Sequence, residues 1–290
     1  MKATKLLLAL GLMMISAVGH AQSFVWNTNT GDSTGGLAAQ SQTDNSQPFV
    51  IDRQGFVRIA PLFIVQDDFG SSQITSATWL GYGGTSGGAT PTIITSQSGV
   101  VSMTSGNSQA SAAAGNSQIN AAVPMFRAAN GGLSFETRLM AATSDSQVIF
   151  AGLMDATTST IPMQISATSL TSRTFTAGTA NFVGLVFDNR SSISQTVARS
   201  GWVGMGNRNG VSSSAVFTGV PVTANAWVTL RVNVAPTGRA DYFINGRLVG
   251  NTAAGTVNSS TLLVPAVGVM NTNSTTRNVL VDYIQASQRR

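Results

Sequence analysis

The side chains that could carry acid–base or binding chemistry in this sequence are nearly all carboxylates and guanidinium groups. The 290 residues include 11 acidic residues, 16 lysines and arginines, one histidine and no cysteine. Glu136 is the only glutamate, and both lysines (Lys2, Lys5) and His20 fall within the first 21 residues. Residues 22–290 therefore cannot form a Ser-His-Asp triad, a thiol nucleophile, a lysine Schiff base or a tetrahedral N/S zinc site. We assign no catalytic residue from the sequence.

Glu136 is the one residue that raises the question of glycoside hydrolysis, which needs two carboxyl groups in opposed roles. It could pair with Asp155 or Asp188, but no spacing along the chain requires either pair. A carboxylate on a strand more often lies on the surface or faces an arginine across the sheet, here Arg138 or another. The sequence therefore predicts a protein that is not an enzyme.

A second group of residues has the chemistry of a ligand site. Sugar sites usually combine an aromatic face with amide, carboxylate and guanidinium groups that bond sugar hydroxyls. The candidate ligand-binding residues, on neighbouring predicted loops, are Asp188, Asn189, Arg190, Trp202, Asn207 and Arg208. The alternatives are that the tryptophan lies in the core and that the arginines serve a protein interface.

Calcium is the one metal whose ligand preferences this composition satisfies, because it binds oxygen ligands. Four aspartates sit beside predicted strand ends, namely Asp155, Asp188, Asp241 and Asp282. No spacing groups them, and capping a turn is the ordinary role of an aspartate there. We predict no cofactor and no dedicated metal site, with calcium in a loop as the alternative.

The elements that would position these residues are short strands. Leu133–Met140 and Trp227–Val234 alternate between two sets of side chains, as expected of strands with one buried face. Asn245-Gly246 between two apolar runs predicts a two-residue hairpin with a type I′ turn. About a dozen such strands with turn residues between them predict an all-β fold, an antiparallel two-sheet jelly-roll sandwich with an N-terminal arm.

Three sections are expected along the chain. Residues 1–21 have a positive start, an apolar run and small residues at Gly19 and Ala21, which is the pattern of a signal peptide. Residues 22–66 form a polar N-terminal arm with a short hairpin around Gln54-Gly55, and residues 67–290 form the sandwich. No later apolar run reaches the roughly 20 residues of a membrane span.

The succession of strands resembles the concanavalin A-like jelly-roll superfamily, which includes laminin-G-like modules, legume-type lectins and laminarinase-type glucanases. The resemblance covers about 67–286, and the segments that carry it are 131–140 (GGLSFETRLM), 148–156 (VIFAGLMDA), 182–189 (FVGLVFDN), 202–210 (WVGMGNRNG), 227–234 (WVTLRVNV), 241–250 (DYFINGRLVG) and 278–286 (NVLVDYIQA). Within the superfamily, the strand order and the sequences of these segments are most similar to jelly-roll domains of phage-type structural proteins. The Glu-x-Asp-x-x-Glu arrangement of the glucanase branch is absent, as is the metal-binding histidine of the legume lectins.

This resemblance implies a non-enzymatic surface module with a structural or adhesive role, like phage virion decoration or fibre proteins. The alternative is an exported bacterial glycan-binding protein, with a glycoside hydrolase third. The expected partner is a glycan or a protein surface, with capsid or homo-oligomer contacts. Nucleic acid is not expected, because the arginines are scattered and only Arg289-Arg290 are adjacent. The expected location is outside the cytoplasm (periplasmic, extracellular or cell-surface), with the virion as the alternative.

The leader gives the first testable prediction. Because Gly19 and Ala21 are small residues at the −3 and −1 positions of a cleavage site, exported protein should begin at Gln22. The intact mass of the exported protein measures this directly, and a mass that retains Met1 would contradict it.

Overall fold

A computed structural model of the chain describes residues 23–26, 37–40, 49–51, 57–59, 62–70, 74, 78–84, 88–94, 99–106, 116–155, 163–166, 174–177, 179–189, 201–213, 215–271 and 275–289. All the regular secondary structure within these ranges is β-strand. These ranges contain no helix that is long and apolar enough to cross a membrane. The chain divides into two compact units, residues 1–61 and 62–290.

The first unit contains one antiparallel sheet of four strands in the order β1-β2-β3-β4. Its strands are β1 (Ser23–Trp26), β2 (Leu37–Gln40), β3 (Phe49–Ile51) and β4 (Val57–Ile59). Strands β3 and β4 pair at the predicted hairpin, with Phe49 opposite Ile59. The expected polar arm therefore contains a small sheet, and the predicted signal peptide lies outside the described residues.

The second unit starts at Leu62 and not at residue 67. The reason is that β5 (Leu62–Asp67) pairs along β22 (Asn278–Arg289), from Leu62 opposite Arg289 to Asp67 opposite Ile284. The beginning and the end of this unit therefore lie on adjacent strands.

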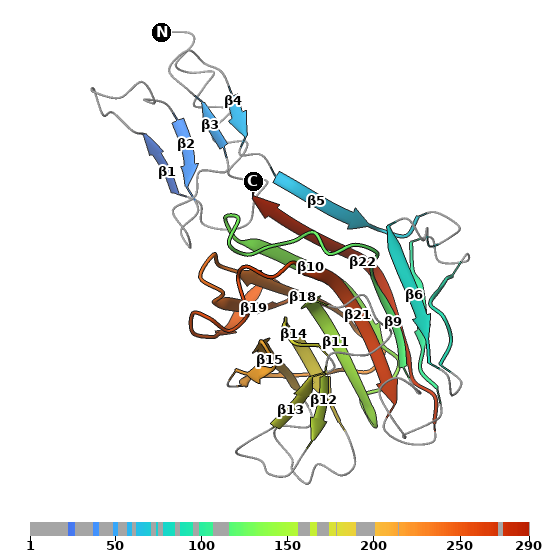
Figure 1. The fold of residues 1–290 in the computed structure, drawn as a ribbon. Helices are drawn as coiled ribbons and strands as arrows, with labels where there is room; N and C mark the ends of the chain where they lie inside the picture. The colour runs from blue at the N-terminus through green and yellow to red at the C-terminus, as the bar shows by residue number, and fades with distance from the viewer. Residues whose placement is uncertain are drawn as a thin grey trace. The chain divides into compact units, whose positions relative to one another are not determined.

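Two eight-stranded antiparallel sheets form the second unit, stacked as two layers (Figure 1). The first, here called the β10 sheet, has the order β20-β19-β18-β10-β22-β8-β7, with β5 also on β22. Its other strands are β7 (Thr92–Ile93), β8 (Val101–Thr104), β10 (Leu133–Ala141), β18 (Trp227–Val234), β19 (Ala240–Ile244) and β20 (Arg247–Asn251).

The second layer, here called the β14 sheet, has the order β16-β15-β14-β11-β21-β9-β6, with β17 also on β15. Its strands are β6 (Trp79–Gly83), β9 (Asn116–Ala121), β11 (Gln147–Met154), β14 (Phe182–Asp188), β15 (Gly201–Arg208), β16 (Val211–Ser212), β17 (Val216–Pro221) and β21 (Val264–Asn271). A separate pair joins β12 (Met163–Ser166) to β13 (Thr174–Ala177). The predicted all-β two-sheet sandwich is confirmed.

The β10 sheet has one buried and one solvent-facing side, as its alternation predicts. In β10, Leu133, Phe135, Thr137 and Leu139 are buried, whereas the residues between them are half-exposed. Strand β18 continues the pattern, with Leu230, Val232 and Val234 buried. The charged residues of both strands therefore share the outer side of this sheet.

The β14 sheet differs because β11, β14 and β21 are buried along their whole lengths, on both faces. Small residues let large rings enter the space between the two layers. A Cβ on Gly204 of β15 would lie 2.5 Å from the ring of Tyr242 on β19, so the ring packs directly on the glycine backbone. This contact joins the two sheets near their edge.

The Asn245-Gly246 hairpin between β19 and β20 is confirmed. Both residues have positive φ, 50° and 78°, as a type I′ turn requires. Asn245 also accepts a hydrogen bond from the Thr229 N–H at 2.9 Å through its side-chain oxygen. A side chain at Gly246 would meet no atom within 4 Å, so only the backbone conformation restricts this position.

The turn yields the second prediction. Gly246→Val places a β-branched residue at positive φ and should lower the free energy of unfolding by about 1–3 kcal/mol. Gly246→Asn is the matched control, because asparagine tolerates this conformation and no neighbour obstructs either side chain. Thermal unfolding measures both, and equal melting temperatures for the two variants would contradict the role of the turn.

Candidate functional site

The structure does not bring the six predicted ligand residues together. Strands β14 and β15 run antiparallel with Phe182 opposite Asn207. Asp188 ends β14 six residues beyond Phe182, which is about 20 Å along a strand. Asn189 lies beside Asp188, Arg208 lies beside Asn207, and Arg190 lies outside the described residues. Two separate ends of the β14 sheet therefore carry these residues.

Trp202 is a core residue in the structure. It is 1% exposed, and its ring centroid lies 6.0 Å from that of Phe187. The side chain offers no accessible ring face, so the alternative of a core tryptophan is the one observed.

At the Asp188 end, the polar groups hold a loop in place. Asn189 donates its backbone N–H to the carbonyl of Gln147 at 3.0 Å and its side-chain amide to the carbonyl of Ser144. Asp188 is 1% exposed. These contacts hold the loop before β11 against the end of β14, so the Asn189 side chain has a structural role.

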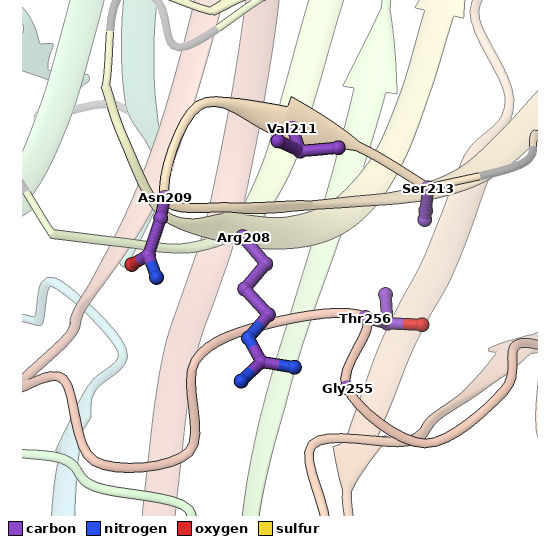
Figure 2. A pocket seen from close by; sticks show the side chains of 6 residues that line it. All are labelled: Arg208, Asn209, Val211, Ser213, Gly255 and Thr256. Atoms are coloured by element: carbon purple, nitrogen blue, oxygen red, sulfur yellow. The ribbon is translucent and has the colours of Figure 1, made fainter.

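At the other end, Arg208 borders a pocket of about 370 Å³, here called the rim pocket. Figure 2 shows the Arg208 side chain extending toward the loop that carries Gly255 and Thr256. The lining residues are Arg208, Asn209, Val211, Ser213, Gly255 and Thr256. They come from the β15–β16 hairpin and from the loop after β20, which meet at this end of the sheet.

Close packing of that loop on β15 forms one side of the rim pocket. A Cβ on Gly206 would lie 2.1 Å from the methyl group of Thr256, so only glycine allows this approach. Thr256 in turn donates its hydroxyl to the carbonyl of Ala253 at 2.8 Å. The sequence contains this signal in the small residues of β15, but nothing in the sequence says which loop they receive.

A chain of hydrogen bonds holds Asn209, one of the lining residues, in place. Asp155 accepts two hydrogen bonds at one carboxylate oxygen, from the N–H and the side-chain amide of Asn181, each at 2.9 Å. Asn181 then accepts the N–H of Asn209 at 3.1 Å, and Asn258 donates to the Asn209 side-chain oxygen at 3.2 Å. Asn209, which has φ of 51°, is thereby fixed in the left-handed conformation of the hairpin turn.

Arg208 itself is exposed, and no hydrogen bond or ion pair connects its guanidinium to any described residue. Its Nη1 atom lies 2.9 Å from the place where a Cβ of Gly255 would stand. The bare glycine backbone therefore leaves room for the guanidinium at the pocket. The site offers hydrogen-bond donors, hydroxyl groups and one apolar side chain, Val211, which is 72% exposed.

A second polar cluster lies on the outer side of the β10 sheet around Glu136. Tyr283 of β22 donates its hydroxyl to Glu136 at 2.7 Å, and Arg231 of β18 places Nη1 3.9 Å from the other carboxylate oxygen. The Tyr283 pKa is raised, mainly by burial and then by the bond to Glu136, so the hydroxyl stays protonated and keeps donating. Arg231 is directly opposite Glu136 in the strand register, which confirms the expected cross-strand arginine.

Asp282 shares this side of the sheet, and the sequence analysis considered it only for loop calcium and not as a neighbour of Glu136. It forms an ion pair with Arg138 at 2.8 Å, and the Arg138 guanidinium also lies 4.9 Å from the ring centroid of Trp227. The sequence suggested Asp155 and Asp188 as partners of Glu136, but both lie elsewhere. Asp188 ends β14 in the other sheet, and Asp155 directly follows β11 of that sheet. Only the pairing of β10 with β22, about 145 positions apart, could have revealed Asp282.

No group of three or more histidine, cysteine or acidic residues that could hold a metal ion occurs within the described ranges. The aspartates suggested for loop calcium have other contacts. Asp155 binds Asn181, Asp241 pairs with Arg239 at 2.8 Å, and Asp282 pairs with Arg138.

No family model and no curated protein matches the sequence. The fold does match solved structures. The β-glucanase of Bacillus licheniformis is 13% identical, covers 78% of this chain and 98% of its own, and has a TM-score of 0.51. LamAcat from Zobellia galactanivorans is 9% identical over 77% of this chain and 96% of its own, with a TM-score of 0.51. SCLam, a non-specific endo-β-1,3(4)-glucanase from family GH16, is 10% identical over 80% and 94%, also at 0.51.

The chain therefore has the same two-sheet fold as these solved structures, which is the fold that the resemblance implied. The comparisons correct two other expectations. The fold matches glucanases, so a phage-type structural module is wrong as the principal interpretation, and so is the exclusion of an enzyme. The physical reason is that alternating strands and hairpin turns are shared by the whole superfamily and cannot distinguish its branches.

Proposed function

We propose that this protein is an exported glycan-binding jelly roll in which the rim pocket holds a sugar unit. Export rests on the leader pattern of residues 1–21. Of the predicted ligand residues, Arg208 contacts the ligand, while Asn207 positions the strand end by donating its side-chain amide to the Thr179 carbonyl at 3.3 Å.

The observation that carries the proposal is the Arg208 guanidinium, which pairs with no described residue, beside a pocket of suitable size and chemistry. A volume of about 370 Å³ lies within the range of small-molecule sites, about 300–1,000 Å³. Arg208 and the Asn209 amide provide polar groups for sugar hydroxyls, and Val211 provides an apolar contact for a ring face.

The pocket is also ordered before any ligand arrives. The bonds from Asp155 through Asn181 to Asn209 fix one wall, and the packing of Thr256 on Gly206 fixes the other. A ligand would then immobilise few protein groups, which lowers the entropic cost of binding.

The third prediction tests this site by substitution. Arg208→Ala should weaken retention on the polysaccharide that the wild type binds by about tenfold or more, because it removes a charged hydrogen-bond donor. Retention of the mature protein on soluble β-glucans, galactans and uronic-acid polysaccharides measures the effect.

Arg247→Ala is the matched control. Arg247 is exposed, lies on β20 outside the rim pocket and forms no ion pair with a described residue. Both variants lose one positive charge, so equal retention by the two would contradict binding at the rim pocket. Failure of the wild type to bind any polysaccharide would contradict the proposed function itself.

Glycoside hydrolysis is a second candidate, favoured by the finding that Glu136 and Asp282 lie on the same side of the β10 sheet. Each side chain is 29% exposed, so both carboxylates reach solvent. Hydrolysis uses two such groups on either side of the glycosidic bond. Tyr283 would orient Glu136 through its hydroxyl.

The fourth prediction follows from this candidate. If the protein cleaves glycans, Glu136→Gln and Asp282→Asn should each lower the release of reducing ends by at least about 100-fold, because each removes a group with its own role in the reaction. Asp241→Asn is the control, since Asp241 is on the same sheet and its one ion-pair partner among the described residues is Arg239, two positions before it. Activity that survives both substitutions would exclude this pair of carboxylates.

A further inference from the structure

We infer that the rim pocket selects glycans with an anionic group, a carboxylate or a sulfate ester, through Arg208. This inference rests on the proposed function and adds the class of sugar to it. Four features support it: the state of the other arginines, the absence of acids from the lining, the placement of the guanidinium and the donor character of its neighbour.

Arg208 differs from four arginines of the sandwich that form ion pairs with acidic side chains of the same chain. Arg138 pairs with Asp282, Arg231 approaches Glu136, Arg239 pairs with Asp241, and Arg277 lies 3.5 Å from Asp145. Two of them also lie over aromatic rings, Arg138 over Trp227 and Arg231 over Phe243. No described side chain compensates the charge of Arg208 in this way.

Among the residues that the structure describes, the lining of the rim pocket contains no acidic residue. The carboxylate associated with its supporting network, Asp155, directs one oxygen at both the N–H and the side-chain amide of Asn181. Arg208 is therefore the one charged residue in the described lining, and an incoming anion meets no carboxylate there.

The guanidinium is also placed to meet an oxyanion. Gly255, which has φ of 77°, presents bare backbone next to Nη1, so the exposed guanidinium lies beside this loop. Next to it, the Asn209 oxygen already accepts from Asn258, which leaves the amide N–H groups of Asn209 as donors. A carboxylate or sulfate can accept two parallel bonds from a guanidinium, and such charged bonds are about twice as strong as neutral ones.

The fifth prediction uses matched polymers with and without the anionic group. We would measure binding of the mature protein to polygalacturonate, its fully methyl-esterified form, dextran sulfate and dextran, at about 0.15 M salt to screen long-range attraction. Wild type should bind at least one acidic polymer about tenfold or more tightly than its neutral counterpart. Arg208→Ala should abolish that preference, and Arg247→Ala should retain it, with unchanged melting temperatures in both variants.

Each outcome has a distinct meaning. An effect with polygalacturonate alone identifies a carboxylate, and one with dextran sulfate alone identifies a sulfate. Equal losses in Arg208→Ala and Arg247→Ala would show general charge attraction and overturn the inference. Arg208-dependent binding to neutral and acidic polymers alike would overturn the anion preference and leave the proposed function intact, whereas no binding to these polymers or to any neutral polysaccharide would overturn both.

Discussion

The structure depends on the burial of one apolar face from each of two antiparallel sheets. The chain has no cysteine, so no disulfide supplements this core. Strands β10 and β18 contribute side chains at alternate positions, and the β14 sheet contributes strands that are buried throughout. Large rings fill the space between the sheets, and Tyr242 fits there because Gly204 has no side chain. Burial of a tyrosine hydroxyl raises its pKa, so Tyr242 remains neutral in the core.

This requirement determines where polar chemistry can occur. Within the sandwich, an aromatic ring such as that of Trp202 is used for packing and is lost to ligands. Polar groups remain accessible on the outer side of the β10 sheet and at the ends of strands, where the alternation stops. Arg208 is the last residue of β15 and the first of that strand to be exposed, which explains why the pocket forms at this end.

The sequence predicts features whose causes are local. The φ values of Asn245 and Gly246 follow from two adjacent residues, and the buried face of β10 follows from alternation within one strand. The candidate site depends on pairing across the chain and was only partly predicted. Asp188 and Arg208 are 20 positions apart, yet the antiparallel pairing of β14 and β15 puts them at opposite ends of the sheet. Asp282 reaches the neighbourhood of Glu136 only through the pairing of β22 with β10.

Charge placement distinguishes the two polar sites. On the β10 sheet, the two carboxylates already have partners, since Tyr283 bonds Glu136 and Arg138 bonds Asp282. A glycan that used these carboxylates would first have to displace those contacts, at a cost comparable with the bonds it gained. At the rim pocket, the guanidinium of Arg208 has no described partner to displace, and its supporting amides are already ordered. On the β10 sheet, ion pairs with arginines already occupy the carboxylates, whereas at the rim pocket the Arg208 guanidinium is available to a ligand. This difference favours ligand binding at the rim pocket over glycan hydrolysis on the β10 sheet.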